Sequence, residues 1–203
     1  VFHILGCGAI GSSAALQIAR MGATRFCLYD MDKVEEVNIG VSQYNFDDVG
    51  KPKVNALEAH LRAVGVYSIG SFNERFVEYY PQGQTDIAIL GFDSMKSRME
   101  AVEALCGTQG VKPLYIIDGR MGAEHYQQYI IDKPTVNKYK KIWYSDEEGS
   151  PEPCNAKATS YCSNLSGSFI ANAIRKLATN QPYNKKFTFN FPNMLLEKSP
   201  MVS

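Results

Sequence analysis

The sequence lacks the features that mark membrane, secreted and nucleic-acid-binding proteins. Its 203 residues carry 21 basic and 21 acidic side chains, so the net charge of zero offers no attraction to nucleic acid or to an anionic membrane. No apolar run approaches the roughly 18–20 residues of a membrane-spanning helix, and no signal peptide is visible. We therefore expect a cytoplasmic protein without a nucleic-acid or membrane partner.

Cysteine and histidine are too sparse, and too scattered, to predict a metal centre or a catalytic triad. The five cysteines include no Cys-x-x-Cys pair, which argues against a structural zinc site of that kind. Cys7 and Cys27 lie in apolar segments, where a free thiol packs as a small hydrophobic side chain. An odd number of cysteines in this context favours a reducing compartment. The three histidines show no partner pattern.

Apolar runs alternate with helical patterns along the first part of the chain. This alternation predicts an α/β, Rossmann-like fold, in which a mostly parallel sheet has helices on both faces. We expect a single domain over 1–203, with its nucleotide-binding half at 1–118. The expected strands are Phe2–Leu5, Arg25–Tyr29, Tyr67–Gly70, Asp86–Gly91 and Leu114–Ile117, and the expected helices are Ile10–Met21, Lys51–Val64, Met95–Cys106 and Asn164–Ala178.

The remaining part, 119–203, does not continue this alternation of apolar runs and helical patterns. His125–Ile131 is rich in aromatic and β-branched residues and predicts an antiparallel strand. Residues 132–153 are polar and predict a long crossover loop of the kind that often serves as a functional lid. Phe187–Phe191 alternates apolar and polar residues, as an edge strand does. This half thus adds antiparallel strands, a crossover loop and a last helix.

The most informative motif is Gly6-x-Gly8-x-x-Gly11, which lies between the first strand and the first helix. In such a motif the first glycine makes a tight turn, the second lets the backbone approach phosphate oxygens, and the third lets helix pack on strand. The start of the helix then offers free N–H groups and a positive dipole end. Asp30 follows at the distance where an acid reaches ribose hydroxyls. Together they predict a nucleotide site.

Further polar residues follow that a nicotinamide cofactor does not require. Asp32, Asn38 and Lys53 come after the second strand, and Asp93 follows a wholly apolar strand, where α/β sheets place their sites. Such a set suits a triphosphate, whose charge must be neutralised while its α-phosphate is attacked.

These residues resemble the pattern of the ThiF/MoeB/HesA family, the E1-like adenylating enzymes that activate ubiquitin-like and sulfur-carrier proteins. The similarity extends from Val1 to about Leu177. It rests on the glycine motif, on Asp30-x-Asp32 with Val34 and Asn38, on Val49-Gly50-Lys51-Pro52-Lys53, and on Phe92-Asp93 followed by Arg98.

The resemblance implies an ATP- and Mg²⁺-dependent adenylyltransferase that acts as a homodimer. Asp30 would hold the ribose, Lys53 the phosphates, and Asn38 would line the triphosphate pocket. Asp93 would position Mg²⁺ and the α-phosphate. The acceptor would be the C-terminal carboxylate of a ubiquitin-like or sulfur-carrier protein or peptide, whose tail lies on the sheet face and the crossover loop.

Three departures from the family pattern leave alternatives open. Val41 stands where relatives carry a phosphate-binding arginine, and Arg120 or a residue of a second subunit would have to replace that charge. The paired Cys-x-x-Cys motifs of many relatives are absent, as is the N-terminal segment that often donates an arginine across the dimer. The alternatives are a catalytically degenerate, partner-binding subunit and an NAD-dependent oxidoreductase. An enzyme acting on a small carboxylate or on a modified tRNA base is a further one.

Relatives that go beyond adenylation carry a cysteine in the crossover before the last helix. Cys154 lies at nearly that distance from the helix at Asn164–Ala178, and its thiolate would accept the acyl group or carry sulfur. Cys162 competes with it because it lies close to the start of that helix. The alternative is that both are ordinary loop cysteines.

Overall fold

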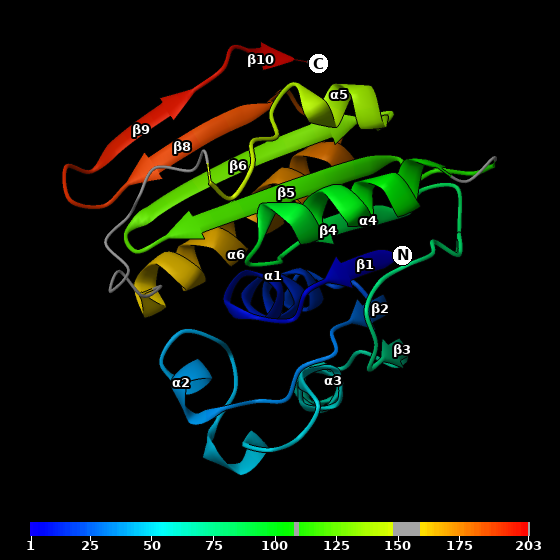
Figure 1. The fold of residues 1–203 in the computed structure, drawn as a ribbon, viewed down its shortest axis with the longest axis vertical. Coiled ribbons are helices and arrows are strands. Elements are labelled where there is room, and N and C mark those ends of the chain that lie inside the picture. Colours follow the sequence, from blue (N-terminus) through cyan, green and yellow to red (C-terminus); the bar gives the residue numbers. More distant parts are fainter. Residues whose placement is uncertain (108–109, 148–158, 203) are drawn as a thin grey trace.

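The computed structural model describes residues 1–107, 110–147 and 159–202. Its centre is an eight-stranded sheet in the order β3-β2-β1-β4-β5-β6-β8-β9 (Figure 1). The neighbouring pairs from β3 to β5 are parallel, and those from β5 to β9 are antiparallel. The strands are β1 (Phe2–Leu5), β2 (Arg25–Tyr29), β3 (Ser68–Phe72), β4 (Ile87–Leu90), β5 (Tyr115–Gly122), β6 (His125–Asp132), β8 (Lys186–Asn190) and β9 (Leu195–Lys198).

Helices cover the two faces of this sheet. The longer ones are α1 (Ala9–Arg20), α3 (Lys53–Ala63), α4 (Met95–Gly107) and α6 (Ser160–Ala178), and the short ones are α2 (Glu36–Ile39), α5 (Val136–Lys140) and the 3₁₀ turn η1 (Phe46–Asp48). Two strands, β7 (Tyr183–Asn184) and β10 (Met201–Val202), form a small separate ribbon. None of the helices in the described ranges is both long enough and apolar enough to cross a membrane.

Successive side chains of each strand point to opposite faces of the sheet and contribute to two hydrophobic cores, one on each face. On one face Ile4, Leu28 and Ile117 pack with α1, α3 and α6, and on the other Leu5, Leu90 and Ile116 pack with α4 and α5. Figure 1 shows α4 and α5 on one side of the strands and α6 on the other. The predicted α/β architecture, with helices on both faces and an added antiparallel part, is confirmed.

The predicted elements are all present, with shifted ends. The strand expected to end at Ile117 continues to Gly122, and the helix expected to begin at Asn164 begins at Ser160. Within the predicted crossover, Val136–Lys140 forms α5, whereas 148–153 lie outside the described residues.

The prediction of an edge strand at Phe187–Phe191 was wrong. The segment forms β8, which pairs with β6 on one side and with β9 on the other, so β9 is the edge. The alternation that suggested an edge has another cause. Phe187 and Phe189 pack on Phe169 of α6, and Thr188 between them points to the opposite face of the sheet.

Candidate functional site

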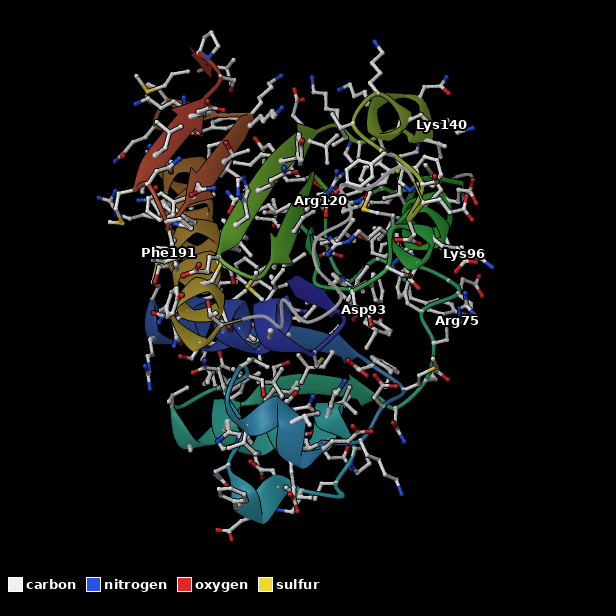
Figure 2. All side chains as sticks on the ribbon, turned by 60° about the vertical axis from the view of Figure 1, so that its left-hand side comes forward. Arg75, Asp93, Lys96, Arg120, Lys140 and Phe191 are labelled. Carbon is white, nitrogen blue, oxygen red and sulfur yellow. The ribbon has the colours of Figure 1, made fainter. Side chains whose placement is uncertain are left out.

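A cleft of about 800 Å³ lies at the carboxyl ends of the parallel strands. This is where open α/β sheets bind their ligands. Its lining includes seven of the predicted site residues: Gly6, Gly8, Asp30, Asp32, Lys53, Asp93 and Arg120. In Figure 2, Asp93 and Arg120 lie toward the interior of the view, whereas Arg75, Lys96 and Lys140 lie toward the periphery.

The glycine turn makes the floor of the cleft. Gly6 has φ +90°, and a Cβ atom on Gly11 would lie 1.9 Å from the carbonyl oxygen of Gly6, so neither position accepts a larger residue without movement. A Cβ on Gly8 would meet no atom within 4 Å among the residues that the structure describes. Gly8 is also the N-cap of α1 and makes no side-chain cap. The first N–H groups of α1 are therefore left for a ligand, as an anion site requires.

Asp30 is held at the end of β2 by two backbone hydrogen bonds. Its carboxylate accepts from the N–H of Cys7 at 2.7 Å and from the N–H of Asp32 at 2.9 Å. Burial raises the pKa of Asp30, and the charge of Lys53 opposes this rise only in part. The carboxylate is thus fixed beside the glycine turn, where a ribose bound to the same phosphates would lie.

Lys53, the first residue of α3, lies among several acids of the cleft. Its Nζ atom is 2.8 Å from a carboxylate oxygen of Asp32. Burial alone would lower the pKa of Lys53, but the carboxylates of Asp32, Asp30 and Asp93 outweigh it and raise that pKa. The side chain is 12% exposed and stays charged, so it offers a fixed positive charge to an anion in the cleft.

Asp93 differs from these residues because its side chain is exposed. Within the described ranges, its carboxylate has neither a hydrogen bond nor an ion pair, although it lies close enough to Lys53 to raise the pKa of that lysine. No group of three His, Cys, Asp or Glu side chains in the described part of the chain is arranged to hold a metal ion. Mg²⁺ at nucleotide sites is commonly bound by one or two carboxylates plus phosphate oxygens, and Asp93 fits that donor set.

Arg120 lies in the wall of the cleft with most of its hydrogen-bonding capacity in use. Its Nε and Nη2 atoms donate to one oxygen of Asp118 at 2.9 and 2.7 Å, and Nη1 donates to the carbonyl of Ile142 at 2.9 Å. The guanidinium also lies 4.6 Å from the ring centre of Tyr129 and 5.2 Å from that of Tyr144. The carboxylate of Asp118 outweighs the effect of burial and raises the pKa of Arg120, which is only 5% exposed.

The remaining predicted residues lie away from the cleft or outside the described ranges. Asn38 does not line the cleft; its side-chain oxygen accepts from the N–H of Glu35 at 2.9 Å and caps α2. Gly11 packs behind the turn. Cys162 is the third residue of α6 and is fully buried, and Cys154 lies outside the described residues.

Several cleft residues were not predicted. Arg75 and Glu100 form an ion pair between the segment after β3 and α4, and both line the cleft with Phe76. Asp146, from the segment after α5, accepts from the N–H groups of Met95 at 2.6 Å and of Lys96 at 3.2 Å and so caps α4. No local motif marks these positions, because each contact joins segments at least 25 residues apart.

Solved structures confirm the fold. PaaA superposes with a TM-score of 0.71 at 19% identity over 98% of this chain and 63% of PaaA. E. coli MccB with ATP gives a TM-score of 0.72 at 18% identity over 98% of this chain and 63% of MccB. MccB with N-formylated MccA gives 0.73 at 17% identity, over 98% and 64% of the two chains.

Sequence comparison places the chain in a family. It is 28% identical to ubiquitin-like modifier-activating enzyme 5 of Rattus norvegicus over 123 residues, a match that covers 53% of this chain and 30% of that enzyme. The chain thus matches less than a third of the length of this relative. The profile of the ThiF family matches residues 2–202, well beyond the Leu177 at which the motif resemblance was expected to end. The chain therefore belongs to the ThiF family.

Proposed function

We propose that this chain is the ATP-binding adenylation domain of an E1-like adenylyltransferase, which activates the C-terminal carboxylate of a ubiquitin-like or sulfur-carrier protein or of a peptide. The observation that carries the proposal is the setting of Asp93. Its exposed carboxylate shares one cleft with the uncapped start of α1 and the partly buried charge of Lys53. A metal-bound triphosphate needs these three features within reach of one another.

The reaction is an in-line displacement at phosphorus. An oxygen of the acceptor carboxylate forms a bond to the α-phosphorus of ATP, and the bond from that phosphorus to the bridging oxygen of the β-phosphate breaks. The products are an acyl adenylate and pyrophosphate, which carries away the bonding electron pair. Such a reaction needs little covalent help from the protein, and catalysis depends on positioning and charge stabilisation.

Each cleft residue has a part in that task. The N–H groups around Gly8 and the start of α1 would hold phosphate oxygens, Asp30 the ribose hydroxyls, and Lys53 the outer phosphates. Asp93 would hold Mg²⁺, which when bound neutralises charge that builds up on the phosphates. The acids of the cleft outnumber its cations, and this balance favours a nucleotide that arrives with its metal.

The acceptor would lie along the antiparallel part of the sheet. Arg120 pairs in register with Gln127 of β6, which pairs with Thr188 of β8, so a row of polar side chains runs from the cleft across the sheet. An extended C-terminal tail would make hydrogen bonds along such a row. MccB has been solved with MccA and with N-formylated MccA, which supports a peptide as one acceptor class.

A degenerate, partner-binding subunit is the second candidate. Val41 supplies no charge, and Arg120, its proposed replacement, already donates to Asp118 and Ile142. For catalysis we propose that the chain acts as a homodimer, in which an arginine of the second copy lies near the phosphates and supplies the missing charge. We also propose that it acts in the cytoplasm. A degenerate subunit would bind ATP and never release pyrophosphate.

The decisive experiment is ATP–pyrophosphate exchange with Mg²⁺ and a panel of carboxylate acceptors that includes ubiquitin-like proteins and short peptides. We expect exchange with at least one acceptor and a loss of about 100-fold or more in Asp93→Ala, since that variant lacks the metal ligand. Asp47→Ala is the matched control, because Asp47 is an exposed acid on η1 outside the cleft. Full exchange in Asp93→Ala would contradict the mechanism, and tight ATP binding without exchange for any acceptor would favour the degenerate subunit.

A further inference from the structure

We infer that Asp118, a fully buried residue of β5 that does not itself line the cleft, is a positioning residue that holds the turn bearing Asp93 and the wall bearing Arg120 in their active arrangement. The inference rests on the proposed function for its catalytic consequence and on the hydrogen bonds around Asp118 for its structural part.

Asp118 joins two arginines that come from different elements. One carboxylate oxygen accepts from Nη1 of Arg98, which lies on α4. The other accepts from Nε and Nη2 of Arg120 and, at 3.0 Å, from the hydroxyl of Tyr139 on α5. All four residues are at most 5% exposed. Such a network has little freedom to rearrange, because each member would lose partners that water does not replace.

Through Arg98, this network reaches the turn that carries Asp93. The guanidinium of Arg98 also donates to the carbonyl of Leu90 at 3.3 Å and to the carbonyl of Phe92. These two carbonyls flank Gly91, on which a Cβ atom would lie 2.8 Å from the carbonyl oxygen of Gly6. The turn before Asp93 therefore packs directly on the glycine turn. Arg98 thus fixes the turn that carries Asp93 against the glycine turn.

Through Arg120 and Tyr139, the same carboxylate reaches the segment after α5. Arg120 donates to the carbonyl of Ile142, and the indole N–H of Trp143 donates at 2.8 Å to the carbonyl of Met95, the first residue of α4. The wall opposite the glycine turn is in this way connected to the α4 helix on which Arg98 lies. Among the described residues, Asp118 is the hydrogen-bond and ion-pair partner that the two arginines share.

Removing the negative charge of Asp118 should change ATP binding and turnover in different ways, which a general loss of folding would not do. Asn in place of Asp118 removes the one carboxylate that forms an ion pair with either guanidinium group in the described part of the chain. The cleft then becomes more positive and keeps its affinity for an anionic nucleotide. At the same time the turn at Asp93 loses its support. We therefore expect Asp118→Asn to retain ATP binding and to lose turnover.

The experiment compares Asp118→Asn with wild type in ATP–pyrophosphate exchange, in Mg·ATP binding by calorimetry and in amide hydrogen exchange of the segment 90–98. We expect kcat to fall about 30- to 100-fold, as misplacement by about 1 Å does, with the Kd for Mg·ATP unchanged or lower. Amide exchange in 90–98 should accelerate about tenfold or more, because the turn opens locally.

Two milder variants keep the test valid if Asp118→Asn does not fold. Tyr139→Phe removes one hydrogen bond to Asp118, and Arg98→Lys keeps the charge but cannot reach both carbonyls with a planar fork. Both should lower kcat about 3- to 10-fold at unchanged Kd, because the turn is loosened rather than lost. The matched controls are Asp86→Asn and Tyr79→Phe. They alter a buried aspartate and its tyrosine partner at the amino end of β4, away from the cleft. These controls should destabilise the protein and leave kcat and the 90–98 segment unchanged.

The inference is overturned if Asp118→Asn or, failing that, Tyr139→Phe and Arg98→Lys keep wild-type kcat and wild-type exchange in 90–98. It is also overturned if Kd and kcat worsen together as they would in a generally destabilised protein. If wild type catalyses no pyrophosphate exchange, the proposed function fails, and the hydrogen-exchange and ATP-binding measurements still decide the positioning role.

Discussion

The two ends of β4 carry aspartates in opposite situations. Asp86 immediately precedes the strand and is fully buried, with hydrogen bonds from Tyr79 at 2.9 Å and from the N–H of Gln82 at 2.7 Å, and with His3 at 3.2 Å. Asp93 follows the strand by three residues and is exposed, without a hydrogen-bond or ion-pair partner in the described ranges. One acid is buried and bound to the fold through hydrogen bonds to one of its oxygens, Oδ2, and the other acid is left available to a ligand.

The two ends of the parallel strands also differ in the direction in which the pKa of an aspartate is shifted, as Asp86 before β4 and Asp30 after β2 show. Burial would raise the pKa of Asp86, but hydrogen bonds from Gln82, Tyr79 and His3 outweigh it and lower that pKa. At the cleft, burial of Asp30 prevails over its partners and its pKa rises. The folded protein thus accepts an energetic cost at the cleft end, which is typical of functional sites.

We expect the largest effect on stability to distinguish Gly11 from Gly8, two glycines of the same turn. Gly11→Ala places a Cβ 1.9 Å from a backbone oxygen, and we expect it to lower the free energy of unfolding by about 3 kcal/mol or more. In Gly8→Ala the added Cβ meets no atom of the described residues within 4 Å. The unfolding free energy of this variant should therefore stay within about 0.5 kcal/mol of wild type, while its affinity for ATP falls about tenfold or more. Urea denaturation and calorimetry test the pair, and equal loss of stability in both would refute this assignment.

The next effect tests the aspartate comparison itself. Asp86→Asn should lower the free energy of unfolding by about 2–3 kcal/mol, because buried donors lose a charged acceptor. Asp93→Asn should change it by less than about 0.5 kcal/mol, because an exposed side chain without a partner is replaced. Denaturant unfolding of both variants decides the matter, and a costly Asp93→Asn would show that Asp93 has a structural role.

A smaller effect is the pH dependence of stability at the Asp86 end. Burial lowers the pKa of His3 despite the nearby Asp86, so His3 stabilises the fold above its unfolded pKa of about 6.5, and this contribution is lost as the pH falls toward its folded pKa. The slope of one proton is at most about 1.4 kcal/mol per pH unit. We expect the unfolding free energy to decline between pH 7 and 5 in wild type and to decline less in His3→Gln. An identical decline in the two proteins would contradict the role of His3.

The smallest effect concerns ATP binding and Asp30. Because the pKa of Asp30 is raised, its carboxylate begins to take up a proton at a higher pH than an ordinary aspartate, and its hydrogen bonds to a ribose weaken. We expect the Kd for ATP to increase up to about fivefold as the pH falls from 7 to 5. In Asp30→Asn the affinity should be lower at pH 7 and independent of pH over this range. A pH-dependent Kd of equal slope in the variant would point to another group.

Local patterns in the sequence were sufficient for the parallel half and its cleft. Strand, glycine turn and helix follow one another within 20 residues, so Gly6, Gly8 and Asp30 were predictable from spacing. Parallel pairing then places Asp93 at the same edge of the sheet, since carboxyl ends coincide. The function of Asp93 itself remains a proposal.

In the antiparallel half, local sequence patterns were not sufficient to predict the structure. The sequence predicted a strand that ends at Ile117, yet β5 continues to Gly122 because β6 supplies hydrogen-bond partners along its whole length. The family resemblance implies a place for Asn38 in the triphosphate pocket, and that role stays a prediction. In the structure its amide oxygen caps a short helix, a use that a sequence pattern does not distinguish. The Arg98–Asp118–Arg120 network joins α4 to β5, and no local spacing reveals it.

Trp143 is the single tryptophan of the chain, and its indole N–H binds the carbonyl of the residue that begins α4. The protein therefore contains an intrinsic fluorophore beside its cleft. Any ligand that shifts the start of α4 or the neighbouring Asp146 changes the polarity around that indole. Nucleotide and acceptor binding are thus open to measurement by emission wavelength and quenching in the unlabelled protein.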